Sequence, residues 1–354
     1  MAGSGTAHLR PEDQTMLRVE HLVVEFPGRA GTVHAVTDVS LDIVQGETLG
    51  LVGESGCGKS TTGRAIVQLP PPVSGSVQLE GTELTKLRGE ALRRMRPTMQ
   101  MIFQDPISSL NPRRKVRDIV AEGLEIWKIG DDASRAAKVD EVLTSVGIDP
   151  ANAERRPHEF SGGQCQRISI ARAVVTEPKL IICDEPVSAL DVSVQAQIIN
   201  LLDEMKQKYK LTLIFIAHDL AVVKNVSDRV IVMYLGKTCE IGDPDAMYAN
   251  PAHPYTAALL AAIPVPDPEV RPDEERVLGG EIPSPVHPPS GCRFRTRCPK
   301  AQARCVDEEP EMREVKPGQY VACHFPLSPG EQLDFAKVGI GGSMNGEGEI
   351  DELG

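Results

Sequence analysis

One stretch of the chain carries the residue types of a phosphate-binding loop. Residues 53–61 read G-E-S-G-C-G-K-S-T and match the pattern G-x-x-x-x-G-K-[ST]. Glycines allow several backbone N–H groups to point at one anion, and a helix beginning near Gly58 would add the positive end of its dipole. Lys59 would bind the β- and γ-phosphates of a nucleotide, and the Ser60 hydroxyl would bind Mg²⁺. The candidate nucleotide-binding residues are Gly53, Ser55, Gly56, Gly58, Lys59, Ser60 and Thr61.

Two acidic residues end an apolar run further along the chain. Residues 180–183 are Leu-Ile-Ile-Cys, as expected of a strand buried on both faces of a parallel sheet, and Asp184 and Glu185 follow directly. Carboxylates at such a position are costly unless they bind a metal or take part in chemistry. We therefore expect Asp184 to hold Mg²⁺, directly or through water, and Glu185 to polarise the attacking water.

Gln104 and His218 also follow apolar runs that are typical of strands, residues 98–103 and 211–217. Ligands of open α/β sheets bind at the carboxyl ends of the strands, so both side chains are candidates for the same site. A lone glutamine or histidine in such a place is more often structural. The functional alternative gives Gln104 a contact with Mg²⁺ and the reacting water, and His218 a contact with the γ-phosphate.

A second candidate anion site lies at residues 161–164, which read S-G-G-Q and precede an apolar helix. Ser161 and the two glycines would stand at the N-terminus of that helix, where backbone N–H groups bind anions. Phe26, an aromatic residue upstream of the loop, is a candidate for stacking on adenine. Core packing at a strand end is an equally good explanation of Phe26, and His34 is a weaker candidate for the stacking role.

Length, charge and apolar content restrict the class of protein. The chain has 354 residues, which suits two domains or one large domain with an appendage, and 41% apolar residues, which is ordinary for a globular protein. Its net charge of −12 argues against a nucleic-acid-binding surface. No apolar run approaches the ~20 residues of a membrane span, and the N-terminus has no signal-peptide core. If the protein acts at a membrane, other chains must cross it.

Composition and periodicity also suggest boundaries along the chain. Residues 1–16 are expected to form a flexible tail, and residues 327–354, rich in Gly and acids, to be disordered. Between 105 and 166 the pattern turns helical, because apolar residues from Val116 to Trp127 recur at helical spacing. This block is expected to be a helical subdomain inserted into a β-rich region.

The order of these motifs resembles that of ATP-binding-cassette (ABC) ATPases over roughly residues 17–245. The resemblance implies an α/β fold with a RecA-like P-loop ATPase core, an inserted helical signature subdomain and a small Cys-containing C-terminal extension over 246–326. It also implies a head-to-tail dimer with ATP and Mg²⁺ between the P-loop of one subunit and the signature of the other. In that arrangement Ser161, Gly163 and Gln164 would meet the γ-phosphate held by the partner, and Asp191 would lie at the dimer interface.

A narrower resemblance covers the second half of the chain. Residues 250–261 (N-P-A-H-P-Y-T-A-A-L-L-A), 280–285 and 288–292 look like the segment that follows the cassette in oligopeptide and dipeptide importers. The sequence P-V-S-A-L-D-V-S around Asp191 is similar to the F-type ATPase subunit of those systems, whereas the D-type partner usually has Thr near the position of Ser188. The F-type is therefore preferred over the D-type.

Four cysteines cluster near the end of the chain, with the spacing Cys292-x5-Cys298-x6-Cys305-x17-Cys323. Four thiolates within about thirty residues suit Zn²⁺ or an iron–sulfur cluster, but the C-x2–4-C knuckles of zinc sites are missing. Disulfides are disfavoured in a reducing cytoplasm. The resemblance to peptide importers implies a [4Fe–4S] cluster, with zinc as the second choice and free thiols as the third. A structural role is the simplest interpretation of the four cysteines, and the sequence gives no separate support for redox sensing.

The sequence is thus interpreted as the ATPase subunit of a peptide importer at the cytoplasmic face of the cell membrane. The expected partners are a second ABC ATPase subunit, two transmembrane permease subunits and an extracytoplasmic peptide-binding protein, with no nucleic acid. One alternative keeps the importer but changes the cargo to nickel, glutathione or haem. Another is a soluble ABC ATPase of DNA repair or translation. A P-loop kinase or GTPase would not need residues 161–164.

Overall fold

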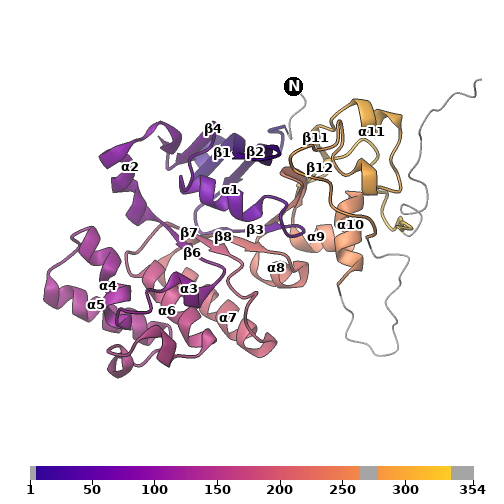
Figure 1. Cartoon of the computed structure of the whole chain (residues 1–354). Coiled ribbons are helices and arrows are strands. Elements are labelled where there is room, and N and C mark those ends of the chain that lie inside the picture. Colours follow the sequence, from indigo (N-terminus) through magenta and orange to yellow (C-terminus); the bar gives the residue numbers. More distant parts are fainter. Residues whose placement is uncertain (1–4, 264–277, 336–354) are drawn as a thin grey trace, which may run out of the picture.

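The computed structural model describes residues 5–263 and 278–335, and these form two β-sheets surrounded by helices (Figure 1). The strand order in the larger sheet is β11-β12-β10-β9-β3-β8-β7-β6, and in the smaller sheet it is β2-β1-β4-β5. The larger sheet consists of β3 (Thr48–Val52), β6 (Met99–Ile102), β7 (Leu180–Asp184), β8 (Thr212–Ala217), β9 (Arg229–Tyr234), β10 (Lys237–Gly242), β11 (Met312–Lys316) and β12 (Gln319–Ala322).

The centre of the larger sheet is parallel. Strands β9, β3, β8, β7 and β6 all run in the same direction, and every residue of β3, β7 and β8 is buried. This burial explains why their sequences are apolar runs without alternation. Because parallel strands end at one edge of a sheet, the residues that follow β3, β6, β7 and β8 meet there.

The smaller sheet is antiparallel and lies over helix α1 (Lys59–Ile66) on one side of the larger sheet (Figure 1). Its strands are β1 (Leu17–Gly28), β2 (Gly31–Ile43), β4 (Ser74–Leu79) and β5 (Thr82–Glu83). One apolar cluster joins these layers, since Leu17 of β1, Ile66 of α1 and Ile214 of β8 are all completely buried in it. The position of α1, and with it the loop before it, is therefore fixed by packing on both sides.

One group of helices lies together at the lower left of Figure 1, and α9 (Pro244–Ala249), α10 (Pro254–Ala261) and α11 (Ala303–Asp307) lie on the right. The first group, in magenta, occupies the stretch where a helical subdomain is expected and comprises α3 (Pro106–Ser109), α4 (Val116–Ile126), α5 (Asp132–Ser145) and α6 (Gly162–Val174). The others are α2 (Gly89–Met95), α7 (Val192–Tyr209) and α8 (Leu220–Val226). Helix α4 ends before Trp127, which is partly exposed beneath the Arg93 guanidinium, 5.1 Å from the ring centroid, instead of continuing the buried face.

The C-terminal region is part of the larger sheet. Strand β12 pairs with β10 through Glu240 and Val321, and β11 pairs with β12, so a hairpin from the region after residue 246 extends the cassette sheet. The carboxylate of Glu240 accepts hydrogen bonds from the N–H groups of Ala252 (2.9 Å) and His253 (2.8 Å), just before α10. The start of the C-terminal region and its β11–β12 hairpin therefore both contact the cassette at β10.

The ends of the described chain differ from the expected flexible tails. His8 is 4% exposed and its ring Nε2 is 2.9 Å from the Ser40 carbonyl oxygen, and Arg10 binds two acids of the core. At the other end Phe335 is 2% exposed and packs on the main apolar cluster. The expectation of disorder is wrong for residues 5–16 and 327–335, because each segment buries side chains. Residues 1–4 and 336–354 lie outside the described part of the chain.

Candidate nucleotide-binding site

The loop between β3 and α1 has the backbone conformation that its glycines allow. Gly53 has φ 153° and Gly58 has φ 104°, values that other residues rarely adopt. A Cβ atom would lie 2.2 Å from the Met233 carbonyl oxygen at Gly53 and 2.3 Å from the Ala35 carbonyl oxygen at Gly58. Both the conformation and the close packing therefore require glycine. Ser55, Gly56 and Thr61 lie in or directly after the same loop.

Lys59 is the first residue of α1, and its ammonium group lies inside the loop. The residue is 4% exposed, and its Nζ donates to the carbonyl oxygens of Gly53 (2.7 Å) and Glu54 (2.9 Å). Gly58, which precedes the helix, provides no side-chain cap. The first N–H groups of α1 and the lysine charge together suit an anion with several oxygens, such as a triphosphate.

Ser60 and Asp184 are direct neighbours. The Ser60 hydroxyl donates to Asp184 Oδ1 at 2.5 Å, Asp184 is fully buried, and Arg64 Nη2 lies 3.3 Å from Asp184 Oδ2. A hydroxyl and a carboxylate are the hard oxygen donors that Mg²⁺ prefers. Among the described residues no three acids, histidines or cysteines are grouped to hold a metal ion. Magnesium bound here would therefore need phosphate oxygens and water to complete its ligands.

Glu185, Gln104 and His218 meet at the carboxyl ends of three neighbouring strands. Gln104 Nε2 donates to Glu185 Oε2 at 2.9 Å, and His218 Nδ1 lies 3.4 Å from the same oxygen. The Glu185 side chain is 13% exposed, and its backbone has a left-handed φ of 47°. The carboxylate of Glu185 is thus carried on a strained turn and contacted by two side chains.

The signature segment, residues 161–164, begins α6. Ser161 is the N-cap: its hydroxyl accepts from the Gln164 N–H at 3.3 Å, and its own N–H donates to Gln164 Oε1 at 2.9 Å. A Cβ at Gly163 would lie 2.7 Å from Val194 Cγ1, so this end of α6 packs on the start of α7. Asp191, the N-cap residue of α7, is exposed and makes no side-chain capping bond.

Phe26 lies near the end of the β1–β2 hairpin opposite Val33 and is 37% exposed. The same hairpin reaches the loop, because the carbonyl oxygen of Ala35 lies against Gly58. His34 is engaged with Glu25, with 2.8 Å between Nδ1 and Oε1. The arrangement leaves Phe26 more available than His34 for stacking on a base.

Sequence reasoning missed two residues of the C-terminal region that contact the loop. Arg297 forms a two-bond ion pair with the Glu54 carboxylate, and the Tyr255 hydroxyl accepts a hydrogen bond from the Glu54 N–H. Tyr255 lies in a motif that the sequence singles out, but nothing local indicates that it reaches a loop 201 positions away. Such contacts depend on how the C-terminal region folds back.

The four C-terminal cysteines are brought near one another without a single-ion metal site. All are free thiols, and the Cys292 N–H donates to the Cys305 carbonyl oxygen at 2.8 Å. Burial raises the pKa of Cys298 to about 12, and the neighbouring Cys323, Cys292 and Cys305 act in the same direction. In the part of the chain that the structure describes, no three such side chains have the arrangement that one metal ion requires. Neither the expected [4Fe–4S] cluster nor the zinc ion is therefore supported by the described residues.

Comparisons with known proteins agree with this geometry. Residues 36–188 match the family described as ABC transporter, and residues 239–305 match the oligopeptide/dipeptide transporter C-terminal region. The oligopeptide transport ATP-binding protein AppF of Bacillus subtilis is 51% identical over 302 residues, covering 85% of this chain and 92% of AppF. The corresponding OppF of Haemophilus influenzae is 49% identical over 321 residues, covering 88% of this chain and 97% of OppF.

Solved structures show the same fold in the cassette. The cbiO1 protein of Clostridium perfringens, part of the ABC transporter complex cbiONQ, superposes with a TM-score of 0.60 and 30% identity. The superposed region covers 67% of this chain and 91% of cbiO1. The dimeric ATP-binding cassette MJ0796, bound to ADP and Pi after hydrolysis, has a TM-score of 0.60 and 26% identity, with 65% of this chain and 99% of that one covered.

Proposed function

We propose that this chain hydrolyses ATP to power import of di- and oligopeptides. The premise is its family: the chain belongs to the ABC transporter family and to its oligopeptide transport ATP-binding proteins. The observation that carries the proposal is the meeting of the Lys59 loop, the Ser60–Asp184 pair and Glu185 at one edge of the parallel sheet. The peptide-transporter match of residues 239–305 supports the cargo class.

The chemistry assigned to this site is attack of water on the γ-phosphate. Lys59 and the loop N–H groups bind the phosphates, and Ser60, Asp184 and Gln104 would hold Mg²⁺, which neutralises charge on the phosphate oxygens. Glu185 orients and polarises the water as general base, because its carboxylate lies at the open end of the sheet. Gln104 and His218 both contact Oε2 of that carboxylate and help to hold it in place, and His218 is proposed to contact the γ-phosphate.

A second ATPase subunit would complete the site. Ser161 and Gln164 cap the start of α6 and bond to each other, so this second anion site is built separately from the Lys59 loop. We assign Ser161, Gly163 and Gln164 to the γ-phosphate bound by a partner cassette, with Asp191 at the interface. A heterodimer is preferred, since the sequence around Asp191 favours the F-type subunit. The solved MJ0796 cassette is itself described as dimeric.

Membrane partners have a candidate docking groove. It lies between the core and α4, and several of its apolar side chains are exposed: Leu69 (49%), Phe103 (37%) and Ile126 (49%). None of the described helices is long and apolar enough to cross a membrane. We therefore assign the groove to two transmembrane permease subunits, place this chain at the cytoplasmic face, and expect an extracytoplasmic peptide-binding protein to deliver the cargo.

We assign the four C-terminal cysteines to a [4Fe–4S] cluster because their spacing resembles that of peptide importers. Cys292, Cys298, Cys305 and Cys323 are electrostatic neighbours, and thiolates are the ligands that such clusters use. When bound, the cluster would staple a segment that has few apolar residues. Anaerobically prepared protein should contain iron and sulfide, and Cys298→Ser should lose both while Cys165→Ser, a buried helix residue, keeps them. Equal iron in both variants would overturn the assignment.

The experiment that tests the function is an anaerobic pull-down of the full chain from its native membranes, analysed by mass spectrometry. Recovery of two multi-span subunits, a second cassette and a peptide-binding protein would support peptide import. Recovery with a binding protein for nickel, glutathione or haem would change the cargo, and recovery with ribosomes or DNA would overturn the transport function. The net charge of −12 argues against nucleic acid.

A further inference from the structure

Glu54, in the Lys59 loop, is held by two residues of the C-terminal region. Arg297 donates two parallel hydrogen bonds to its carboxylate, from Nη1 to Oε2 at 2.7 Å and from Nη2 to Oε1 at 3.0 Å. The backbone N–H of Glu54 donates to the Tyr255 hydroxyl oxygen at 2.8 Å. The carbonyl oxygen of Glu54 accepts from Lys59 Nζ, so one residue connects the C-terminal region to the lysine of the loop.

These contacts are partly buried, unlike an ordinary surface ion pair. The side chains of Arg297 and Glu54 are 4% and 24% exposed, and Tyr255 is completely buried. The Arg297 guanidinium also donates to the Gly279 carbonyl oxygen at 3.1 Å and lies 5.8 Å from the centroid of the Tyr234 ring. Because it is fixed from several directions, Arg297 loses little freedom when it pairs with Glu54.

We propose that Arg297 and Tyr255 are positioning residues for ATP binding, which hold Glu54 so that the loop keeps its shape and its acid is neutralised. The proposal rests on the ATP site assigned above. It gives the C-terminal region a role in the nucleotide site of its own chain. Arg297 directly precedes Cys298 in the sequence.

Two physical reasons make such support necessary. The loop contains Gly53, Gly56 and Gly58, all with positive φ, so its backbone has more freedom to lose on ordering than other residues would have. Glu54 also adds a negative charge to a loop that must wrap a triphosphate, and an unpaired carboxylate there would repel the phosphates. The bidentate contact with Arg297 removes that repulsion while keeping the carboxylate in a fixed direction.

The test measures MgATP binding to the full chain by calorimetry. Arg297→Ala should weaken MgATP binding about ten-fold, which corresponds to about 1.4 kcal/mol, and Arg297→Lys should recover part of the loss as a single point charge. The matched control is Arg295→Ala. Arg295 lies in the same short turn as Arg297, but it donates to the Ser290 carbonyl oxygen (3.0 Å), so the control should bind like the wild type.

A double-mutant cycle separates a charge effect from a loss of folding. Adding Glu54→Gln to Arg297→Ala should restore part of the affinity, since the uncompensated acid is then gone. Tyr255→Phe, which keeps the ring but loses the acceptor, should weaken binding about three-fold. Thermal unfolding is measured for every variant. If Arg297→Ala does not fold, MgATP binding is measured instead with the double variant Arg297→Gln/Glu54→Gln and with Tyr255→Phe.

Unchanged MgATP affinity in Arg297→Ala, or strictly additive effects in the cycle, would overturn the proposal. If Arg297→Ala does not fold and the cycle cannot be completed, wild-type MgATP affinity in Tyr255→Phe would overturn the proposal. A wild-type chain that binds no MgATP would instead refute the proposed function, so the two failures are distinguishable.

Discussion

Glu185 is the residue on which turnover is expected to depend most directly. Its backbone N–H donates to the Ile216 carbonyl oxygen at 3.0 Å, and Gln104 and His218 contact its carboxylate. Glu185 is thus held by two separate parts of the chain, the end of β6 and the end of β8. A carboxylate held in this way needs little reorganisation to act on a water molecule.

Glu185→Gln should therefore keep MgATP affinity and lower ATP turnover by ~10²–10⁴-fold, the usual contribution of a positioned general base. The measurement is single-turnover and steady-state phosphate release in the assembled transporter. Glu204→Gln, at an exposed position of α7, is the matched control. Hydrolysis near the wild-type rate in Glu185→Gln would remove Glu185 from this role.

Lys59→Ala should weaken nucleotide binding itself, by roughly 10²-fold, because it removes a buried charge that points into the phosphate loop. Calorimetric titration with MgATP provides the measurement. The exposed Lys86 offers a matched control, and its alanine variant should bind as the wild type does. Equal affinity for all three proteins would mean that the phosphates bind elsewhere.

At the scale of elements, the short strand β5 is held by one carboxylate. Glu83 accepts hydrogen bonds from the Val77 N–H (3.1 Å), the Thr85 N–H (3.2 Å), the Thr85 hydroxyl (2.6 Å) and the Ser76 hydroxyl. Burial opposes ionisation of this group, but the hydrogen bonds outweigh it and lower the pKa of Glu83 below its ordinary value of 4.5. The carboxylate therefore stabilises the edge of the smaller sheet in its ionised form.

The lowered pKa of Glu83 sets the direction of a pH effect. The Glu83 carboxylate binds a proton more readily in the unfolded chain than in the folded protein. Its stabilising effect is therefore present above about pH 4.5 and is lost as the pH falls through the folded-state pKa of Glu83. Glu83→Gln should lower the free energy of unfolding by about 1 kcal/mol at pH 7, with a smaller difference in acid. Urea unfolding at several pH values measures this effect. Glu90→Gln, 58% exposed, is the control, and a pH-independent difference would contradict the explanation.

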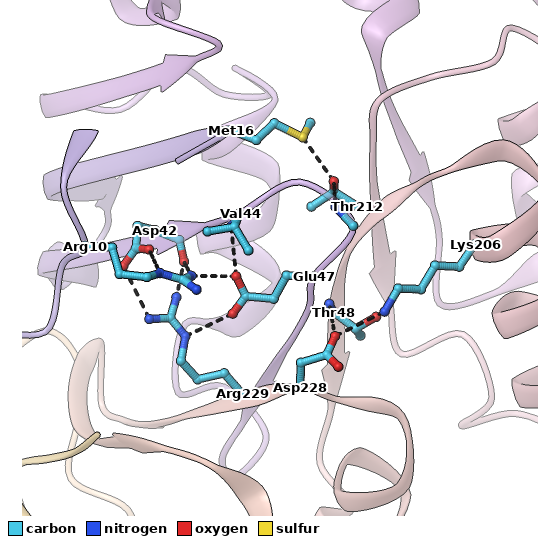
Figure 2. A network of polar contacts seen from close by, with 11 residues as sticks. Arg10, Met16, Asp42, Val44, Glu47, Thr48, Lys206, Thr212, Asp228 and Arg229 are labelled. Carbon is cyan, nitrogen blue, oxygen red and sulfur yellow. Dashed lines mark hydrogen bonds and ion pairs between the residues drawn. The ribbon is translucent and has the colours of Figure 1, made fainter. Parts of the chain in front are cut away.

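At the scale of the whole molecule, a buried polar network joins the N-terminal segment to both sheets (Figure 2). Arg10 and Arg229 each contact both Asp42 and Glu47, with Arg10 Nε 2.5 Å from Asp42 Oδ2 and Arg229 Nε 3.1 Å from Glu47 Oε1. Asp42 is the second-last residue of β2 in the smaller sheet, and Arg229 begins β9 of the larger sheet. The acids are buried, so both arginines are needed to balance their charge.

Arg10→Ala should accordingly lower the free energy of unfolding by about 2 kcal/mol, because charged hydrogen bonds to two buried carboxylates are lost. Arg29→Ala, at an exposed position of the β1–β2 turn, provides the comparison. Urea unfolding at constant ionic strength is the measurement. Equal free energies of unfolding for the two variants would contradict the stabilising role of Arg10 and of the segment 5–16 that carries it.

The sequence by itself determined the parts of this protein whose chemistry is local. Contiguous residues specify the Lys59 loop, the acids after β7 and the S-G-G-Q start of α6, because each needs only a strand end or a helix end nearby. From the apolar runs, the parallel strands and the common edge of Gln104, Glu185 and His218 could also be predicted.

Only the tertiary structure decided how distant segments complete these parts. The pairing of Arg297 with Glu54 joins positions 243 residues apart, and Arg10 reaches Asp42 and Glu47 from a stretch that reads as a tail. The β11–β12 hairpin likewise joins the cassette sheet through β10. Such contacts have no local pattern, since an arginine or a glutamate in sequence is compatible with solvent and becomes a buried partner only when the chain folds back.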